Sequence, residues 1–436
     1  MDHDKLYKSR IVSPEEAVRK IQSGQRIFLT GNCSVPQIIL SALVDYAPEL
    51  SDVEICQALT VGPADYVSSE MDGHLRVNTI FISGNVRDAV HEGRSDFTPV
   101  LLSEFPLLFK NGVLPLDVAL VHVSPPDEHG FCSFGIEVGL TKSPAESADI
   151  LIAEVNQQMP RTLGDSFIHV SRLDYLVPVD YPLQELLMGG GKPDEVVDKI
   201  ASHISELIPD GATMQMGIGA IPDAVMKYLY DKKDLGIHTE MFSDGVIDLV
   251  NAGIITNTRK SIQTGKITAG FVIGSKRLYE WVDDNPIIDF HPTEYVNDPF
   301  VIAQNDRQVS INSAIEIDLT GQVCTDSIGP KLYSGVGGQF DFIYGASRSK
   351  EGVPIIALPS TAKLRDGTTV SRIVPMLKQG AGVVTTRNHV WFVVTEYGVA
   401  DLFGKTIRQR SKSLINIAHP QFRKDLLKQA TELHYL

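Results

Sequence analysis

The sequence predicts an α/β fold made of two similar domains with mainly parallel sheets. Apolar runs of strand length alternate with amphipathic helical patterns along the chain, and the two halves resemble each other. Continuous apolar runs of this length are typical of strands that are buried on both faces. The clearest expected strands are residues 26–31, 117–123, 150–155, 213–219, 353–359, 383–386 and 390–396, and the clearest expected helices are residues 13–24, 192–208 and 222–233.

Helix-start and linker signals in the chain support this division. Ser13, followed by Pro14 and two acidic residues, has the pattern of a helix N-cap, first position and first turn. Three glycines and a Lys-Pro pair around residues 187–195 form the best linker candidate. We therefore expect one domain over residues 1–187 and a second over residues 192–436.

One α/β unit is repeated in the two halves. Each half has an amphipathic helix, a glycine-containing turn, a strand and the pattern G-x-x-x-x-P, which is GNCSVP at residues 31–36 and GIGAIP at residues 217–222. We interpret this as duplication, although all βα units look somewhat alike. The strand that follows is VEICQAL in the first half and GIHTEMF in the second. Glu240 lies in the second of these strands, whereas the first has Gln57 near the equivalent place.

Composition excludes several classes of protein. The 436 residues favour two domains, and the net charge of −15 argues against general nucleic-acid binding while allowing an anionic small ligand. The N-terminus lacks the pattern of a signal peptide, and no apolar run is long enough to cross a membrane. We expect a cytoplasmic protein without a disulfide framework, because the four cysteines are scattered: Cys33, Cys56, Cys132 and Cys324.

The GIGAIP stretch follows an expected strand and opens an expected helix. Glycines let a ligand approach the backbone, and a helix start presents N–H groups that suit an anion. The stretch lacks the dinucleotide fingerprint, because Pro222 stands where its third glycine would be, and it lacks the lysine of a Walker loop. The residues alone leave open whether it is a ligand loop or a tight turn.

Two later stretches are also candidates. Within residues 333–347, Gly335, Gly337 and Gly338 can turn several N–H groups toward one point, as in an oxyanion hole, with a surface loop as the alternative. Residues 311–323 alternate like a half-buried strand. In that strand Asn312 either orients a carbonyl group or is a satisfied core amide.

The remaining polar residues carry weaker signals. Lys405, Arg408 and Arg410 form either a solvated helix face or a rim for phosphate groups. His129 and His238 have no His or Cys at ligand spacing, so we expect no metal site. A serine nucleophile has little support, because the chain has no G-x-S-x-G elbow.

Five motifs in order resemble the acetyl-CoA hydrolase/transferase family: GIGAIP, EMFSDG, NSAIEIDLTGQ, SGVGGQFDF and TEYGVADLFGKT. The stretches DVALVHVSPPDEHGFCSFG and INIAHPQFRKDL extend the resemblance over nearly the whole chain. Within the family, the closest likeness is to the 4-hydroxybutyrate and butyryl-CoA:acetate CoA-transferases. The resemblance implies duplicated α/β domains of the class I CoA-transferase type, with the active site between them.

The resemblance also implies a reaction and its residues. Coenzyme A would pass between a short-chain acyl-CoA, of the 4-hydroxybutyryl- or butyryl-CoA type, and acetate through a glutamyl-CoA thioester on Glu240. Acyl-CoA would be a substrate, and no metal would take part. The implied CoA-binding residues are Gly217, Ile218, Gly219, Ala220, Ile221, Ile315, Gly338 and Lys363.

Two other functions remain open. An acyl-CoA hydrolase would use the same glutamate and admit water to the intermediate. A ligand-sensing module is less favoured, because such a module is expected to lose Glu240 and to carry a DNA-binding segment. By analogy with the family we expect a homo-oligomer, a dimer, that binds small-molecule substrates and neither nucleic acid nor membrane.

Overall fold

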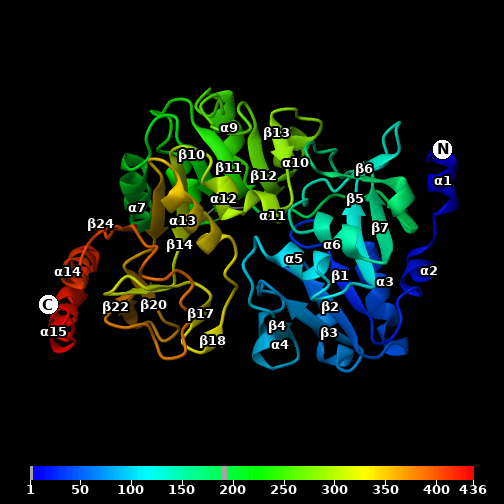
Figure 1. Ribbon diagram of the computed structural model, residues 1–436. Coiled ribbons are helices and arrows are strands. Elements are labelled where there is room, and N and C mark those ends of the chain that lie inside the picture. The colour runs from blue at the N-terminus through cyan, green and yellow to red at the C-terminus, as the bar shows by residue number, and fades with distance from the viewer. Residues whose placement is uncertain (1–2, 188–193, 218) are drawn as a thin grey trace. The chain divides into compact units, whose positions relative to one another are not determined.

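The computed structural model describes residues 3–187, 194–217 and 219–436 of the chain (Figure 1). Its contacts define two compact units. The first unit contains Met1–Leu187 and Thr268–Val296, and the second contains Met188–Ile267 and Asn297–Leu436. Most of the expected linker around residues 187–195 lies outside the described residues.

The first unit is built on a parallel seven-stranded sheet with the order β4-β3-β2-β1-β5-β7-β9. Its strands are β1 Arg26–Leu29, β2 Val53–Gln57, β3 Leu75–Thr79, β4 Asp96–Phe97, β5 Val118–Val123, β7 Ile150–Asn156 and β9 Tyr175–Val179. Every residue of β5 is buried, as its continuous apolar sequence predicts. The short strands β6 Phe131–Ser133 and β8 Phe167–His169 form a separate antiparallel pair.

The second unit repeats this strand order. Its sheet contains the run β11-β10-β14-β19-β23-β24, in which β24 alone is antiparallel to its neighbour. These strands are β10 Thr213–Met216, β11 Gly236–Phe242, β14 Gln308–Ser313, β19 Val353–Ala357, β23 Phe392–Thr395 and β24 Gly398–Asp401. In each unit the first strand is interior, the next strand lies on one side of it and a later strand on the other. The shared order agrees with the predicted duplication.

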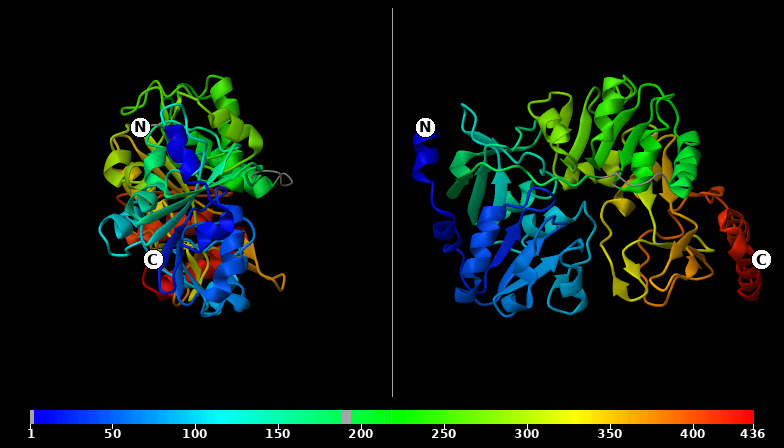
Figure 2. Two further views of the ribbon diagram at one scale, coloured as in Figure 1. Left: turned by 90° about the vertical axis from the view of Figure 1, so that its right-hand side faces the viewer. Right: turned by 180° about the vertical axis from the view of Figure 1, so that it is seen from behind.

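Helices lie on both sides of the two sheets (Figures 1 and 2). In the first unit they are α1 His3–Ser9, α2 Pro14–Val18, α3 Gln37–Tyr46, α4 Arg87–His91, α5 Phe105–Lys110, α6 Lys142–Ser147, α10 Lys276–Val282 and α11 Thr293–Val296. In the second unit they are α7 Glu195–Glu206, α8 Ala220–Met226, α9 Gly245–Asn251, α12 Pro299–Ile302, α13 Gln339–Arg348, α14 Ile407–Ile417 and α15 Pro420–Glu432. None of the described helices is long and apolar enough to cross a membrane.

Smaller strands complete the two units. Strands β12 Ile267–Val272 and β13 Ile288–Phe290 belong almost entirely to the first. The second also contains the sheet β16-β15-β22 and two hairpins, β17–β18 and β20–β21. Their strands are β15 Glu316–Asp318, β16 Val323–Cys324, β17 Ser327–Ile328, β18 Lys331–Leu332, β20 Thr361–Lys363, β21 Thr369–Ser371 and β22 Ile373–Val374.

Several expected elements differ in extent. The predicted N-cap at Ser13 is confirmed and forms a capping box with Glu16, but the helix ends at Val18 and continues as tighter turns. The strand expected over residues 383–386 is wrong, because only an isolated bridge from Thr385 to Val323 forms there. The strand expected over residues 311–323 is broken into β14 and the short strands β15 and β16.

Candidate active site

Glu240 lies where β11 leaves its ladder with β10. The pairing of the two strands covers only Thr213 with Gly236 and Met214 with Ile237. Beyond these pairs, the Thr239 hydroxyl bonds to the backbone of β10. It accepts from the Met216 amide over 3.2 Å and donates to the Met216 carbonyl over 2.9 Å. Neighbouring residues of a strand point to opposite faces, so Thr239 closes the gap to β10 while Glu240 points to the other side.

Neutral donors surround the Glu240 carboxylate. The Asn297 side chain donates from Nδ2 to Oε2 over 3.1 Å, and the Gly338 amide donates a second hydrogen bond. Burial raises the pKa of Glu240 to about 7, and the two hydrogen bonds only partly oppose this shift. Among the described residues no Lys, Arg or His forms an ion pair with this carboxylate. A carboxylate in this setting is weakly solvated and close to its titration point at neutral pH.

Gly338 must be a glycine. It is the N-cap of α13, so the positive end of that helix faces Glu240. A Cβ atom at Gly338 would collide with Oε2 of Glu240 and lie 2.6 Å from Nδ2 of Asn297. The predicted role of the glycine-rich segment as a hydrogen-bond donor therefore has a geometric basis, and its described partner is the glutamate itself.

The GIGAIP loop follows β10 directly and faces open space. Among the described residues, no atom outside the adjoining residues lies within 4 Å of the position that a Cβ would take at Gly217 or Gly219, and the φ of +120° at Gly219 strongly favours glycine. Neither packing nor backbone strain among the described residues explains why residue 217 is glycine. Ile218 lies outside the described residues.

The last two predicted residues of this loop begin helix α8. Ala220 is exposed, whereas the Ile221 side chain is buried in the core at 7% exposure. The Ile221 side chain is therefore part of the core.

The loop after β14 begins beside the GIGAIP loop, because Met216 and Ile311 are paired at the ends of their strands. Asn312 donates to Oε1 of Gln215 over 3.1 Å, so it orients a β10 side chain and not Glu240. Ile315 is half-buried at the bend before β15. Strand order reverses between β10 and β14, and ligands of open α/β sheets bind outside the carboxyl ends of strands at such a point.

Helix α13 is tied to this second loop. Gln339, the residue after Gly338, donates from Nε2 to the Ser313 carbonyl over 2.6 Å. The same side chain accepts from the Thr325 hydroxyl over 2.9 Å. One continuous set of contacts therefore joins Glu240, Gly338 and the loop after β14.

Other candidates lie apart from this site. Lys363 is exposed on β20, where no described hydrogen bond or ion pair connects it to Glu240 or the glycine loops. Arg410 is buried and donates to the carbonyls of Thr320 and Arg387, so it is not part of an exposed phosphate rim. His129 is exposed in its loop, as is Arg408 on α14. The described residues contain no cluster of metal-ligating side chains.

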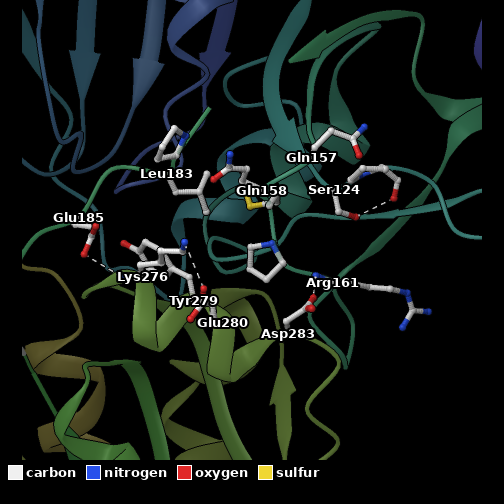
Figure 3. A pocket seen from close by; sticks show the side chains of 14 residues that line it. Ser124, Gln157, Gln158, Arg161, Leu183, Glu185, Lys276, Tyr279, Glu280 and Asp283 are labelled. Carbon is white, nitrogen blue, oxygen red and sulfur yellow. Dashed lines mark hydrogen bonds and ion pairs between the residues drawn. The ribbon is translucent and has the colours of Figure 1, made fainter. Parts of the chain in front are cut away.

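The first unit contains a pocket of about 340 Å³ (Figure 3). It lies outside the carboxyl ends of β5, β7 and β9, against α10, and its lining includes Ser124, Gln157, Arg161 and Tyr279. None of the described residues predicted for the site lines this pocket. Its charged side chains already interact, for example Arg161 with Asp284 over 2.7 Å.

Asn297 is the site residue that the sequence did not reveal. It comes 57 residues after Glu240 along the chain, is fully buried, and follows helix α11 in a segment without glycine or repeat signals. Only the folded chain brings its amide to the glutamate. No local pattern in the sequence marks it.

The chain is similar to known proteins over nearly its whole length. The chain matches the models of the acetyl-CoA hydrolase/transferase N-terminal domain over residues 1–182 and C-terminal domain over residues 274–430. It is 50% identical to 4-hydroxybutyrate coenzyme A transferase of Clostridium kluyveri, in an alignment covering 98% of this chain and 99% of that protein. It is 38% identical to butyryl-CoA:acetate CoA-transferase of Anaerostipes caccae, with 99% and 98% covered. The solved structure of 4-hydroxybutyrate CoA-transferase from Porphyromonas gingivalis is similar with a TM-score of 0.85, 40% identity and 99% of each chain covered.

Proposed function

Because the chain belongs to the acetyl-CoA hydrolase/transferase family, we propose that it transfers coenzyme A from a short-chain acyl-CoA to acetate with Glu240 as the nucleophile. The names of the relatives support 4-hydroxybutyryl-CoA or butyryl-CoA as the acyl donor. The observation that carries the proposal is the Glu240 carboxylate, held by two neutral donors and raised in pKa by burial.

The first half of the reaction loads coenzyme A onto the protein. Oε1 of Glu240 attacks the thioester carbonyl carbon, and the C–S bond breaks with its electron pair leaving on the thiolate. The thiolate then attacks the glutamyl carbonyl carbon of the resulting anhydride, and the first carboxylate leaves. The product is a glutamyl-CoA thioester, and no proton needs to move.

The second half runs these steps in reverse. Acetate attacks the glutamyl carbonyl and expels the thiolate, and the thiolate attacks the acetyl carbonyl of the new anhydride. Acetyl-CoA and the Glu240 carboxylate result. Each covalent step exchanges one acyl bond for another of similar energy, so water has to be excluded from the intermediates.

Asn297 and Gly338 have two roles in this scheme. In the resting state they position the carboxylate, and Asn297 holds Oε2 so that Oε1 is the attacking oxygen. When the glutamyl carbonyl is itself attacked, the same donors face the oxygen that becomes negatively charged. One donor of this kind is worth about 3 kcal/mol, or roughly 10²-fold in rate.

The open glycine loop is the proposed site for the CoA chain. Gly217 and Gly219 present backbone to open space, and Ile315 lies in the neighbouring loop. Ala220 and the backbone of Ile221 continue the proposed contact surface. Lys363 remains a proposed contact to a phosphate or pantetheine oxygen of CoA, from the family resemblance.

Trapping of the intermediate tests the proposal. The protein is incubated with acetyl-CoA and then with borohydride, which reduces a glutamyl thioester to an alcohol that peptide mass spectrometry locates. We expect the modification on Glu240 in the native chain and none in Glu240→Gln. Absence of any adduct on Glu240 refutes the covalent scheme, and CoA release without an acceptor acid indicates a hydrolase instead.

We also propose a cytoplasmic location and a homodimer. The four cysteines support the first, because all are buried and unpaired, as is typical of proteins in a reducing compartment. The dimer rests on the family resemblance alone. Light scattering coupled to gel filtration measures the mass directly, and a monomer refutes that part of the proposal.

A further inference from the structure

Arg372 is a half-buried cation that forms no ion pair with any described acid. It lies between β21 and β22, and its backbone is fixed at both ends. Its amide donates to the Ser360 carbonyl, and its carbonyl accepts from the Ile317 amide, each over 2.9 Å. The guanidinium makes one long hydrogen bond, from Nη1 to the Ala314 carbonyl over 3.4 Å.

The acid whose charge acts on Arg372, Glu396, is already engaged. Glu396 accepts hydrogen bonds from both the amide and the hydroxyl of Ser360, and among the described residues it does not approach Arg372 to ion-pair distance. Burial lowers the pKa of the Arg372 guanidinium, and the more distant charge of Glu396 only partly opposes this. A partly desolvated charge without a counter-ion is costly unless a ligand supplies one.

Contacts connect Arg372 to the candidate active site. The Gly338 amide binds Glu240, and Gln339 next to it binds the Ser313 carbonyl. Ser313 adjoins Ala314, whose carbonyl receives the Arg372 hydrogen bond. The arginine thus contacts the first residue of the loop after β14, which begins beside the GIGAIP loop at the carboxyl edge of the second sheet.

We propose that Arg372 binds an oxyanion of a substrate, either a phosphate of coenzyme A or the carboxylate of an acid. A forked guanidinium with one weak protein contact suits bidentate binding of either group. The chain as a whole has a net charge of −15, so an anionic substrate depends on single cations placed at the site. This inference rests on the proposed function, because it assumes that CoA thioesters bind at this edge.

Binding of ligands that share one end and differ at the other tests the proposal. Titration calorimetry measures the affinity of coenzyme A and of pantetheine, which lacks every phosphate, for the native chain, Arg372→Gln and Arg372→Lys. The matched control is Arg365→Gln, which removes an exposed arginine from the turn of the same β20–β21 hairpin. Initial rates with acetyl-CoA and acetyl-pantetheine give the KM for the acceptor acid.

Two results support the proposal and identify the source of the oxyanion. A fall of roughly 10- to 100-fold in CoA affinity for Arg372→Gln, with pantetheine unchanged, identifies a phosphate. A similar rise in the KM for the acid with both thioesters identifies a carboxylate. Arg372→Lys retains the positive charge but not the two parallel donors of the guanidinium. We therefore expect an intermediate loss of CoA affinity, or an intermediate rise in the KM for the acid.

Unchanged affinity and KM in both variants overturn the proposal. If Arg372→Gln does not fold, Arg372→Lys alone tests the proposal. A CoA affinity and an acid KM of Arg372→Lys that both lie within twofold of the native values then refute the proposal. Borohydride trapping in the same samples separates this result from the proposed function. A missing Glu240 adduct in the native chain refutes the covalent scheme, whereas the CoA titration still reports on Arg372.

Discussion

The two copies of the G-x-x-x-x-P loop have the same spacing and opposite surroundings. In the first unit, a Cβ at Gly31 would lie 2.5 Å from the Leu59 carbonyl oxygen, and the Asn32 amide donates to that same oxygen. In the second unit, Gly217 faces open space. The same local sequence pattern therefore packs against its own chain in one copy and is open to a ligand in the other.

The acids of the two equivalent strands differ in the same way. Burial alone would raise the pKa of Glu54 in β2, but hydrogen bonds and charge from Arg26 together with a hydrogen bond from Asn78 lower it. Glu240 in β11 has an asparagine but no arginine, and its pKa is raised. An acid with a counter-ion stabilises a strand pair, whereas an acid without one remains available for chemistry.

The largest expected effect separates the two glutamates. Glu240→Gln removes the nucleophile and should lower kcat by roughly 10⁴-fold or more. Glu54→Gln removes a half-buried acid from the equivalent strand and should leave kcat within twofold. Steady-state rates with acetyl-CoA and butyrate measure both. Comparable losses of kcat in the two variants would contradict the assignment of a catalytic acid to the second unit and a structural acid to the first.

The two asparagines give the next largest contrast. Asn297→Ala removes a donor to the Glu240 carboxylate and should lower kcat by ~10²-fold. Asn78→Ala removes the corresponding hydrogen bond, which Nδ2 of Asn78 donates to Oε1 of Glu54 over 2.8 Å. This variant should change only stability. Thermal unfolding and kcat measured on both variants check this. A normal kcat in Asn297→Ala would remove the proposed oxyanion role.

The pH profile should follow Glu240. The carboxylate attacks only when ionised, so kcat/KM should fall about tenfold per pH unit below a midpoint near 7. Glu54→Gln should leave this midpoint in place, because hydrogen bonds and the charge of Arg26 keep the pKa of Glu54 low. A midpoint at 4 to 5 in the native chain would show that the carboxylate is solvated.

Substitution of the two loop glycines should have opposite consequences. Gly31→Ala forces Cβ against backbone and should cost about 2–3 kcal/mol of unfolding free energy, with the activity of the folded fraction unchanged. Gly217→Ala has room in the structure, so stability should hold while the KM for acyl-CoA rises by about tenfold. Urea unfolding and substrate titration measure these effects. A normal KM in Gly217→Ala contradicts the proposed CoA loop.

A further expected effect is on the pH dependence of stability. Because burial raises the pKa of Glu240 from 4.5 to about 7, the folded state binds its proton more tightly than the unfolded state. The native chain therefore loses stability as the pH rises through 7, by up to about 3 kcal/mol. Glu240→Gln should be the more stable protein at pH 8, and the advantage should vanish below pH 4.5. Equal Tm values at pH 8 would argue against a desolvated carboxylate.

Features set by local sequence were predictable. Buried apolar runs gave the main strands, and the glycine spacing located both loops, since each signal lies within a few residues. Register was harder to predict. Gly31 and Gly217 are equivalent, so Ile27 is the equivalent of Thr213. Ile27 pairs with Ile55 and Thr213 pairs with Gly236, which makes Ile55 the equivalent of Gly236. Counting on along both strands, the equivalent of Glu240 is Leu59, two residues beyond Gln57.

Features set by distant contacts were not predictable. Residues 311–323 alternate like one strand, but the chain bends at Ile315, where its amide binds the Cys324 carbonyl. Residues 383–386 have strand-forming side chains, yet their backbone forms only an isolated bridge from Thr385 to Val323. Asn297 and Arg372 acquire their surroundings only when segments far apart in the sequence meet.

The division of the chain into units has a consequence for synthesis on the ribosome. Residues 268–296, with helices α10 and α11 and strand β13, belong to the first unit although they follow β11 of the second. The first unit therefore lacks part of its structure until well over half of the polypeptide has emerged. A gene fragment that stops at residue 187 would therefore encode an incomplete first unit, without residues 268–296.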